Sequence, residues 1–235
     1  MPVVELSFPV RGTPLPYDNG YIVYRAVARV VPWVREPAQT ELAILPAQGD
    51  PRYGFLNLTA ASRLAFRLDS DDTPRLLPLA GQRLEIPGGA LTLGQPTRSR
   101  LRPVPSLMSM FVVADRYGPS DEFHEWLKAE ARGLNIRPVP TLRRKRGHEF
   151  VSPIAGGGQP RDCPYARHNR QIGDNAVVGW EVQFRGLKPE ESTRLQERGI
   201  GPGRRYGCGV FVPLNDEPPR RVPRRRDSQV WFPQT

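Results

Sequence analysis

The chain has 235 residues, of which 34 are lysine or arginine and 24 are aspartate or glutamate, so its net charge is +10. This length is sufficient for a proper hydrophobic core in one large domain or two small ones. The positive charge predicts an anionic partner, first nucleic acid and second an acidic membrane surface. We expect no secretion signal, because residues 1–10 have no basic region followed by a long apolar run. The most apolar helix candidate, residues 21–31, is interrupted by Arg25 and Arg29 and is far too short for a membrane span.

The two cysteines, Cys163 and Cys208, have no metal-ligand spacing and no partners in a pattern. Unpatterned thiols are typical of proteins from a reducing compartment. We therefore expect a cytoplasmic protein with no cofactor and no zinc or other metal site.

The first half of the chain alternates between strand and helix patterns. Residues 3–10 predict a strand, after which Asp18 or Asn19 can cap a helix. The residues that this helix turns toward a core are Ile22, Ala26, Val27 and Val30. The elements predicted next are strands over 41–47 and 62–69, a short helix over 73–81 that Pro74 opens, and a hairpin over 82–94 with Gly88 and Gly89 at its turn.

The second half repeats this alternation. Its predicted elements are a strand over 107–115, a helix over 119–133 with Ser120 as cap and Gly133 at its end, a strand over 176–187, a helix over 187–198 with Pro189 in its first turn, and a short buried strand over 209–214. This order predicts an α+β protein made of tandem ferredoxin-like (RRM-like) folds, with domains at 1–100 and 101–214 joined near residues 95–107.

Residues 199–209, GIGPGRRYGCG, place five glycines around two adjacent arginines. Glycine permits φ > 0 and close approach of another chain, and arginine favours phosphate. A dinucleotide-binding turn is excluded because its glycines follow a strand and open a helix, whereas here the order is reversed. The candidate phosphate contacts are Gly201, Gly203, Arg204, Arg205, Gly207 and Gly209. The alternative is a flexible connection with solvated arginines.

Two further segments are basic and lack periodicity. The first is an insertion at residues 142–176. A loop of this length is usually functional or disordered. Its candidate RNA-binding residues are Arg143, Arg144, Lys145, Arg146, His148, Arg167, His168 and Arg170. The second is the arginine- and proline-rich tail at 215–235, which includes the Trp231–Phe232 pair. Such runs are usually solvated and mobile, but arginines with nearby aromatics can also become ordered on RNA.

Residues 177–214, from VVGWEVQFRGL to GCGVFVPL, resemble the C-terminal signature of the CRISPR repeat-RNA endoribonucleases of the RAMP superfamily. Residues 6–32 and 56–86 resemble the compact branch of that family as well. The resemblance covers most of residues 3–214 and leaves residues 147–170 and the tail unmatched. It implies paired ferredoxin-like folds with the glycine loop beside the cleft between them, in contact with RNA.

The resemblance also implies a reaction. Members of the family cut the CRISPR repeat without metal, because the ribose 2′-hydroxyl attacks the neighbouring phosphate and leaves a 2′,3′-cyclic phosphate and a 5′-hydroxyl. This needs a proton acceptor, a proton donor and cations that stabilise the extra negative charge. DNA lacks the 2′-hydroxyl and is excluded as a substrate. Many members then stay on the 3′ hairpin of the product as a subunit of the effector complex.

The sequence departs from this branch at residue 19. The branch commonly has histidine before Gly-Tyr, whereas this chain has Asp18-Asn19-Gly20-Tyr21, and asparagine is no general base. The catalytic candidates are therefore Arg11, Tyr17, Tyr21 and Arg25, with Arg29 as an RNA contact on the same helical stripe as Tyr21 and Arg25. The alternative is a solvated or RNA-contacting stripe without a catalytic role.

Three functions follow as hypotheses. The first is a metal-independent endoribonuclease that keeps its product, with the repeat hairpin and other effector subunits as partners. The second is a hairpin-binding subunit without cleavage activity, and the third is a general RNA-binding protein unrelated to CRISPR. The unusual basic insertion and tail favour one of the compact, less common systems, such as type IV.

Overall fold

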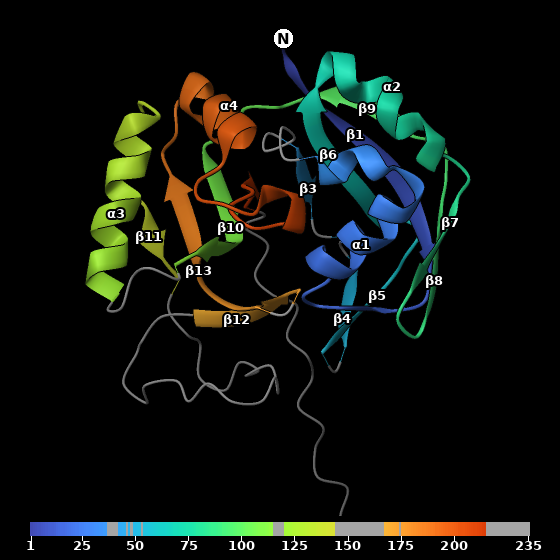
Figure 1. Ribbon diagram of the computed structural model, residues 1–235. Helices are drawn as coiled ribbons and strands as arrows, with labels where there is room; N and C mark the ends of the chain where they lie inside the picture. Colours follow the sequence, from blue (N-terminus) through green and yellow to red (C-terminus); the bar gives the residue numbers. More distant parts are fainter. Residues whose placement is uncertain are drawn as a thin grey trace, which may run out of the picture.

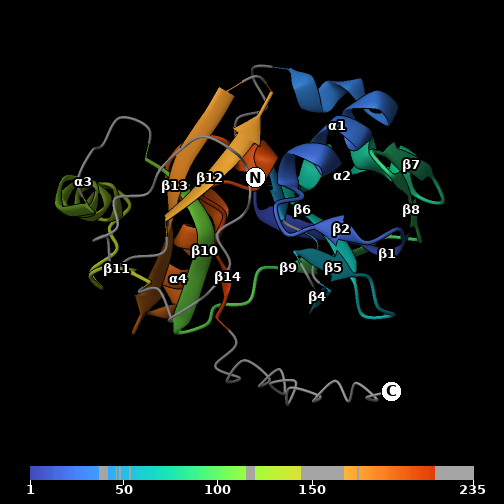
Figure 2. The ribbon, with the colours of Figure 1, turned by 90° about the horizontal axis from the view of Figure 1, so that it is seen from below.

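The computed structural model describes residues 1–36, 42–45, 47, 49–52, 54–114, 120–143, 167–173 and 175–214 (Figure 1). They form two lobes that lie side by side, each a sheet with helices packed against it, as the view from below shows (Figure 2). In the described part of the chain, no helix is long and apolar enough to cross a membrane.

The first lobe contains a βαββαβ unit. Its strands have the order β3-β6-β1-β8, with β7 at the edge, and β9 pairs with the beginning of β1. The elements are β1 (Val3–Gly12), β2 (Leu15–Pro16), α1 (Gly20–Val30), η1 (Pro32–Arg35), β3 (Ala43–Leu45), β4 (Asp50–Arg52), β5 (Phe55–Asn57), β6 (Arg63–Asp69), η2 (Ser70–Asp72), α2 (Thr73–Leu76), η3 (Leu77–Leu79), β7 (Arg83–Ile86), β8 (Gly89–Leu93) and β9 (Thr97–Arg100).

The core of this lobe lies between the main sheet and helix α1. Alternate residues of β1 are buried, because successive side chains of a strand point to opposite faces. Those of β1 that face the core are Val4, Leu6, Phe8 and Val10, and α1 adds Val23, Ala26 and Val27. Ile22 and Val30 pack partly against the same core, so the predicted apolar face of the helix is confirmed.

The second lobe repeats the unit. Its strands have the order β11-β13-β10-β14, and β12 also pairs with β13. The elements are β10 (Ser106–Val113), α3 (Ser120–Gly133), β11 (Thr141–Leu142), β12 (Arg167–Ile172), β13 (Asn175–Arg185), α4 (Pro189–Arg198), η4 (Arg204–Tyr206) and β14 (Val212–Pro213). Two successive βαββαβ units confirm the prediction of tandem ferredoxin-like folds.

The structure corrects the sequence-based elements at several places. Residues 167–172 form strand β12 on β13, although they fall in the insertion predicted to lie outside the packed folds. The last strand, β14, has two residues instead of the six expected. Strands β2, β5 and β4 form a small separate sheet that no pattern predicted. Gly88 alone adopts positive φ in the β7–β8 turn, since Gly89 already pairs with Ile86 in the hairpin.

Helix α4 begins and ends as predicted. Pro189 is its first residue, and Gly199 follows the last one with φ 63°. The Glu191 carboxylate accepts hydrogen bonds from the backbone N–H groups of Lys188 (2.8 Å) and Arg137 (3.0 Å). These bonds lower the pKa of Glu191, because they favour its charged form. The helix start is thereby joined to the segment that follows α3.

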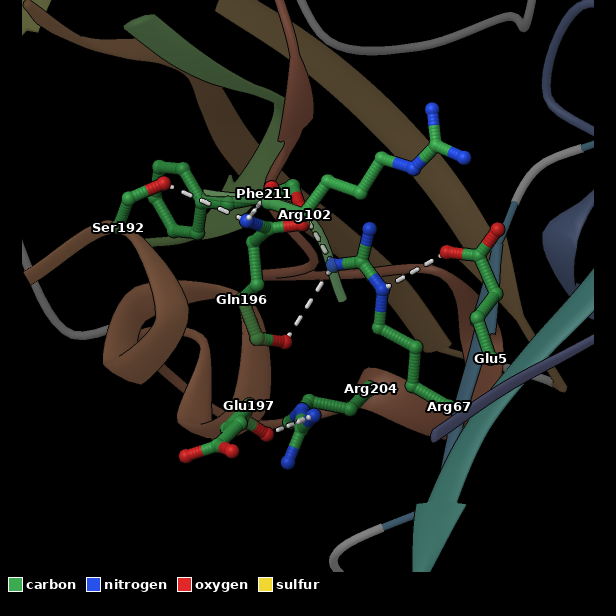
Figure 3. Close-up of polar contacts among 8 residues, drawn as sticks. All are labelled: Glu5, Arg67, Arg102, Ser192, Gln196, Glu197, Arg204 and Phe211. Carbon is green, nitrogen blue, oxygen red and sulfur yellow. Dashed lines mark hydrogen bonds and ion pairs between the residues drawn. The ribbon is translucent and has the colours of Figure 1, made fainter. Parts of the chain in front are cut away.

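The two lobes meet at the buried side chain of Arg67 in β6, which is 1% exposed (Figure 3). Its guanidinium forms an ion pair with Glu5 of β1 at 3.1 Å and donates to the backbone carbonyls of Gln196 and Phe211 in the second lobe. Burial lowers the pKa of Arg67, and the neighbouring Glu5 acts in the opposite direction. Since arginine stays charged in proteins, this is a buried cation with partners from both lobes.

Replacing Arg67 with methionine keeps an apolar stem but removes every one of these bonds. We expect Arg67→Met to lower the free energy of unfolding by about 2 to 5 kcal/mol, because the buried carbonyls of Gln196 and Phe211 lose their donor. The matched control is Arg83→Met, because the ion pair of Arg83 with Glu85 is exposed on both sides. The control should cost less than about 1 kcal/mol. Urea unfolding followed by circular dichroism measures both, and equal losses would contradict the role of Arg67.

Candidate nucleic-acid interface

The glycine loop, residues 199–209, folds tightly on itself. Its five glycines all have positive φ, between 62° and 86°. The N–H of Ile200 donates to the carbonyl of Gly209 at 3.1 Å, and a Cβ on Gly209 would lie 2.1 Å from the Ile200 oxygen. The N–H of Gly209 in turn donates to Phe111 of β10 at 2.7 Å. The close approach that these glycines permit is therefore an approach within the protein, and contacts of Gly201, Gly203, Gly207 and Gly209 with RNA stay a prediction.

The same loop lies against the beginning of helix α1. A Cβ on Gly20, the first residue of α1, would lie 2.1 Å from the Tyr206 carbonyl oxygen. The ring of Tyr206 packs edge-on against Tyr24 at 4.8 Å and against Tyr21 at 5.8 Å, measured between ring centroids. We call Tyr21, Tyr24 and Tyr206 the tyrosine cluster. It joins α1, the helix that carries the catalytic candidates Tyr21 and Arg25, to the glycine loop.

Sequence reasoning missed two members of this cluster, Tyr24 and Tyr206. Burial raises the pKa of Tyr206, although the nearby Arg205 guanidinium acts against this rise. Its phenol is therefore neutral near pH 7 and can donate a hydrogen bond. The available signal was the i, i+3 spacing of Tyr21 and Tyr24 on a helix, which places the two rings on adjoining positions.

Arg170 of β12 connects the second lobe to the segment before α1. Its side chain forms an ion pair with Asp18 at 3.0 Å and donates to the Gly207 carbonyl at 3.4 Å. Its guanidinium also lies 4.3 Å from the centre of the Phe111 ring. Arg170 is only 9% exposed and its guanidinium holds the two lobes together through these partners, while its contact with RNA stays a prediction.

The two arginines of the loop differ in their surroundings. Arg204 is 7% exposed and donates to the Glu197 carbonyl near the end of α4 (Figure 3), where a cation is favoured by the helix dipole. Arg205 is partly exposed, donates to the Arg35 carbonyl at 3.3 Å and lies 5.6 Å from the centre of the Tyr206 ring. Arg205 is therefore the more accessible of the two, and contacts of both arginines with RNA stay a prediction.

Asn19 occupies the position where the resemblance led us to expect histidine. It is 1% exposed, and its Nδ2 donates to the carbonyls of Pro16 (3.2 Å) and Tyr17 (3.4 Å). Its Oδ1 accepts from the N–H of Ala47 at 3.2 Å. The amide group is thus fully used inside the first lobe. It holds the N-cap position of α1 but forms no capping bond with the helix, contrary to the predicted cap.

The structure brings some catalytic candidates together and separates one of them. Tyr21 lies in the tyrosine cluster, and Arg25 lies exposed one turn further along α1. Tyr17 is 48% exposed at the segment before the helix, and burial of its hydroxyl raises its pKa. Arg11 pairs with Thr92 of β8, and strand alternation places both on the face of the sheet opposite α1. The sheet therefore stands between Arg11 and Arg25.

The other predicted RNA contacts either have partners or strand positions within the described residues or fall outside those residues. Arg29 donates to the Glu85 carbonyl at 3.4 Å, and Arg143 forms an ion pair with the buried Glu181 at 2.9 Å. Arg167 and His168 occupy backbone positions of β12 opposite Trp180 and Gly179. The predicted contacts that fall outside the described ranges are Arg144, Lys145, Arg146 and His148, and the tail at 215–235 falls outside them as well.

The contact between Gly20 and Tyr206 predicts that alanine at position 20 changes the free energy of unfolding in an unusual direction. In a helix, replacing glycine by alanine ordinarily stabilises the fold by about 1 kcal/mol. Gly20→Ala should instead lower the free energy of unfolding by about 1 to 3 kcal/mol, because the new Cβ would force the loop away. The control is Gly133→Ala at the end of α3, where a Cβ meets no atom within 4 Å. Chemical denaturation measures both, and a stabilised Gly20→Ala would overturn the packing described here.

Two comparisons bear on identity. The protein family described as "Cas6 Crispr" matches residues 4–216 of the chain. The "CRISPR-associated endonuclease Cas6" of Myxococcus xanthus (strain DK1622) is 29% identical over 213 residues, which make up 91% of this chain and 82% of that protein.

Solved structures share the fold at low sequence identity. The product of a Cas6-related gene from Pyrococcus furiosus superposes with a TM-score of 0.60 at 10% identity, over 92% of this chain and 100% of that one. A protein described as "An RAMP protein binding different RNA substrates" gives 0.59 at 10% identity, over 90% and 100%. Because the family match spans almost the whole described region, the chain belongs to the Cas6 family.

Proposed function

We propose that this protein is a metal-independent endoribonuclease that cleaves CRISPR repeat RNA and keeps the 3′ hairpin of its product as part of an effector complex. Family membership and the endonuclease name of the Myxococcus xanthus relative support RNA processing. The net charge of +10 supports a polyanionic substrate.

The observation that carries the proposal is the junction surface, formed by Tyr21 and Arg25 of α1 and Arg205 of the glycine loop. Tyr21 and Arg25 are helical neighbours, and Tyr206 connects Tyr21 to the loop that bears Arg205. Two guanidinium groups on such a surface can stabilise the charge that develops on a phosphate under attack. A phenol beside them can donate a hydrogen bond that orients the ribose 2′-oxygen, and orientation alone supplies part of the rate.

Arg11 and Tyr17 have different places in this proposal. Tyr17 precedes Asp18 and stays a candidate for placing the 2′-hydroxyl. Arg11 lies across the sheet from α1, so we no longer assign it to the same reacting phosphate as Arg25. His148, His168 and the insertion stay predicted contacts for the stem of the repeat hairpin, because dispersed arginines suit shape-and-phosphate recognition.

The alternative is a hairpin-binding subunit that does not cleave. The burial of Asn19 favours it, since the position expected to hold a base is used for internal hydrogen bonds. Effector-complex subunits as further partners and a type IV system stay predictions in either case.

The two functions are separated by one reaction. Purified protein is incubated with its cognate repeat RNA in EDTA, and the product ends are identified by mass spectrometry. We expect cleavage at one site with a 2′,3′-cyclic phosphate, because the attacking group is the neighbouring 2′-hydroxyl. A repeat with 2′-deoxyribose at that site is the control and should remain intact. Tight binding without any product would establish the non-cleaving alternative.

The junction surface also predicts how variants behave. Arg25→Ala should slow single-turnover cleavage by about tenfold to a thousandfold, which corresponds to about 1.4 to 4 kcal/mol of transition-state stabilisation. Affinity for the repeat should change much less. Arg11→Ala is the comparison variant and should stay near wild type, since its side chain lies on the other face of the sheet.

The pH dependence of the rate belongs to the same experiment. Neutral phenols and guanidinium groups do not titrate near pH 6 to 7, so the profile should show no bend near the histidine pKa of about 6.5. A bend there, together with strong loss of rate in His148→Ala or His168→Ala, would move the reaction into the insertion.

A further inference from the structure

The small sheet β2-β5-β4 presents an unusual outer face. Its inner row, Leu15 and Leu56, is buried against the first lobe. The opposite row runs across all three strands, because Phe55 pairs directly with Pro16 on one side and with Arg52 on the other. Phe55 is 49% exposed and Arg52 is exposed as well. An aromatic ring thus lies on a strand between a proline and an arginine.

Exposed aromatic rings are concentrated at this point of the molecule. Among the described residues, the aromatic side chains that are exposed are Phe55 and Tyr17. The two are close along the structure, because the N–H of Tyr17 donates to the Gly54 carbonyl at 3.2 Å at the tip of the β4–β5 hairpin. Burial is the usual fate of phenylalanine, so a ring left in water on a strand indicates a binding surface when other features agree.

The sheet lies beside the beginning of α1, the helix that carries Tyr21 and Arg25 of the junction surface. Asp18, the residue after Tyr17, forms the ion pair with Arg170 of the second lobe. The buried amide of Asn19 donates to the carbonyls of Pro16 on β2 and of Tyr17, and accepts from the Ala47 N–H before β4. The residue that stands in place of the expected histidine therefore holds this sheet beside the beginning of α1, the helix that carries Arg25.

We propose that the outer face of the β2-β5-β4 sheet stacks an unpaired base of the RNA next to the cleaved phosphate. Phe55 provides the flat apolar surface, and Arg52 contacts the adjoining phosphate. Proteins bind single-stranded RNA in this way, with aromatic rings under the bases and cations along the backbone. The charge of Arg52 favours RNA over an apolar protein partner on the same face. This inference rests on the proposed function, because it names the part of the repeat that the site holds outside the hairpin.

The experiment uses two RNA probes and four forms of the full chain. One probe is the cognate repeat hairpin with its unpaired flanking nucleotides, and the other is the same hairpin without them. The proteins are wild type, Phe55→Ala, Phe55→Trp and Leu77→Ala. Leu77 of η3 is the matched control, because it is an exposed large apolar residue (47%) away from this sheet.

Phe55→Ala should weaken binding of the flanked probe by about five- to 150-fold, the range measured for loss of one stacked base. Its affinity for the bare hairpin should change less than about twofold, because that probe lacks the unpaired base that Phe55 would stack. Phe55→Trp should bind the flanked probe like wild type, and its added indole emission should be quenched by that probe relative to wild type. Leu77→Ala should bind both probes like wild type.

Equal losses on both probes in Phe55→Ala, or unquenched emission in Phe55→Trp, would overturn the stacking role. Wild-type cleavage with unchanged Phe55→Ala binding would overturn this inference and leave the proposed function standing. A wild-type protein that binds the flanked probe through Phe55 but does not cut it would support stacking within the non-cleaving alternative. Wild type that binds neither probe would overturn both.

Discussion

The arrangement of the two lobes depends on one buried cation. Arg67 lies on the face of the first sheet that turns away from α1, and its guanidinium reaches the carbonyls of Gln196 and Phe211 in the second lobe. A buried charge of this kind is stable only when it is fully paired, so the lobes cannot slide without leaving it unsatisfied. Val210 adds apolar contact on the same face with Ala43 and Ala65. The glycine loop is thereby held in one place between the lobes.

That constraint removes several arginines from the protein surface. Composition alone does not distinguish surface arginines from buried ones. Arg67, Arg170 and Arg204 are each at most 9% exposed, and they donate to backbone carbonyls or pair with carboxylates inside the protein. The glycines also serve packing within the protein, since Gly199 and Gly209 let the loop approach itself and Gly20 lets the loop approach the beginning of α1. Among the described residues, the groups that we propose for the junction surface are Tyr21, Arg25 and Arg205. The proposed site lies where the two folds meet and is not a motif complete in the sequence.

Sequence patterns predicted the elements whose faces differ clearly in polarity, such as β1 with its alternate buried residues and α1 with its apolar stripe. They also predicted the ends of α4, because Pro189 and Gly199 suit those positions for local reasons. They did not predict β12, which pairs with β13 through backbone groups that sequence does not reveal. Nor could they show that Arg170 meets Asp18 or that Asn19 bonds Ala47, since these partners lie on elements far apart in the chain. Long-range polar pairing is the part of the site that had to be seen in three dimensions.

The most direct test of the proposed site is a structure of the protein bound to its cognate repeat carrying 2′-deoxyribose at the cleaved nucleotide. We expect the scissile phosphate within hydrogen-bonding distance of Arg25 or Arg205, with Tyr21 beside the 2′ position and the glycine loop still packed on Gly20. A phosphate held at the Arg11 face of the sheet, or a loop that has left α1 to wrap the RNA, would contradict it.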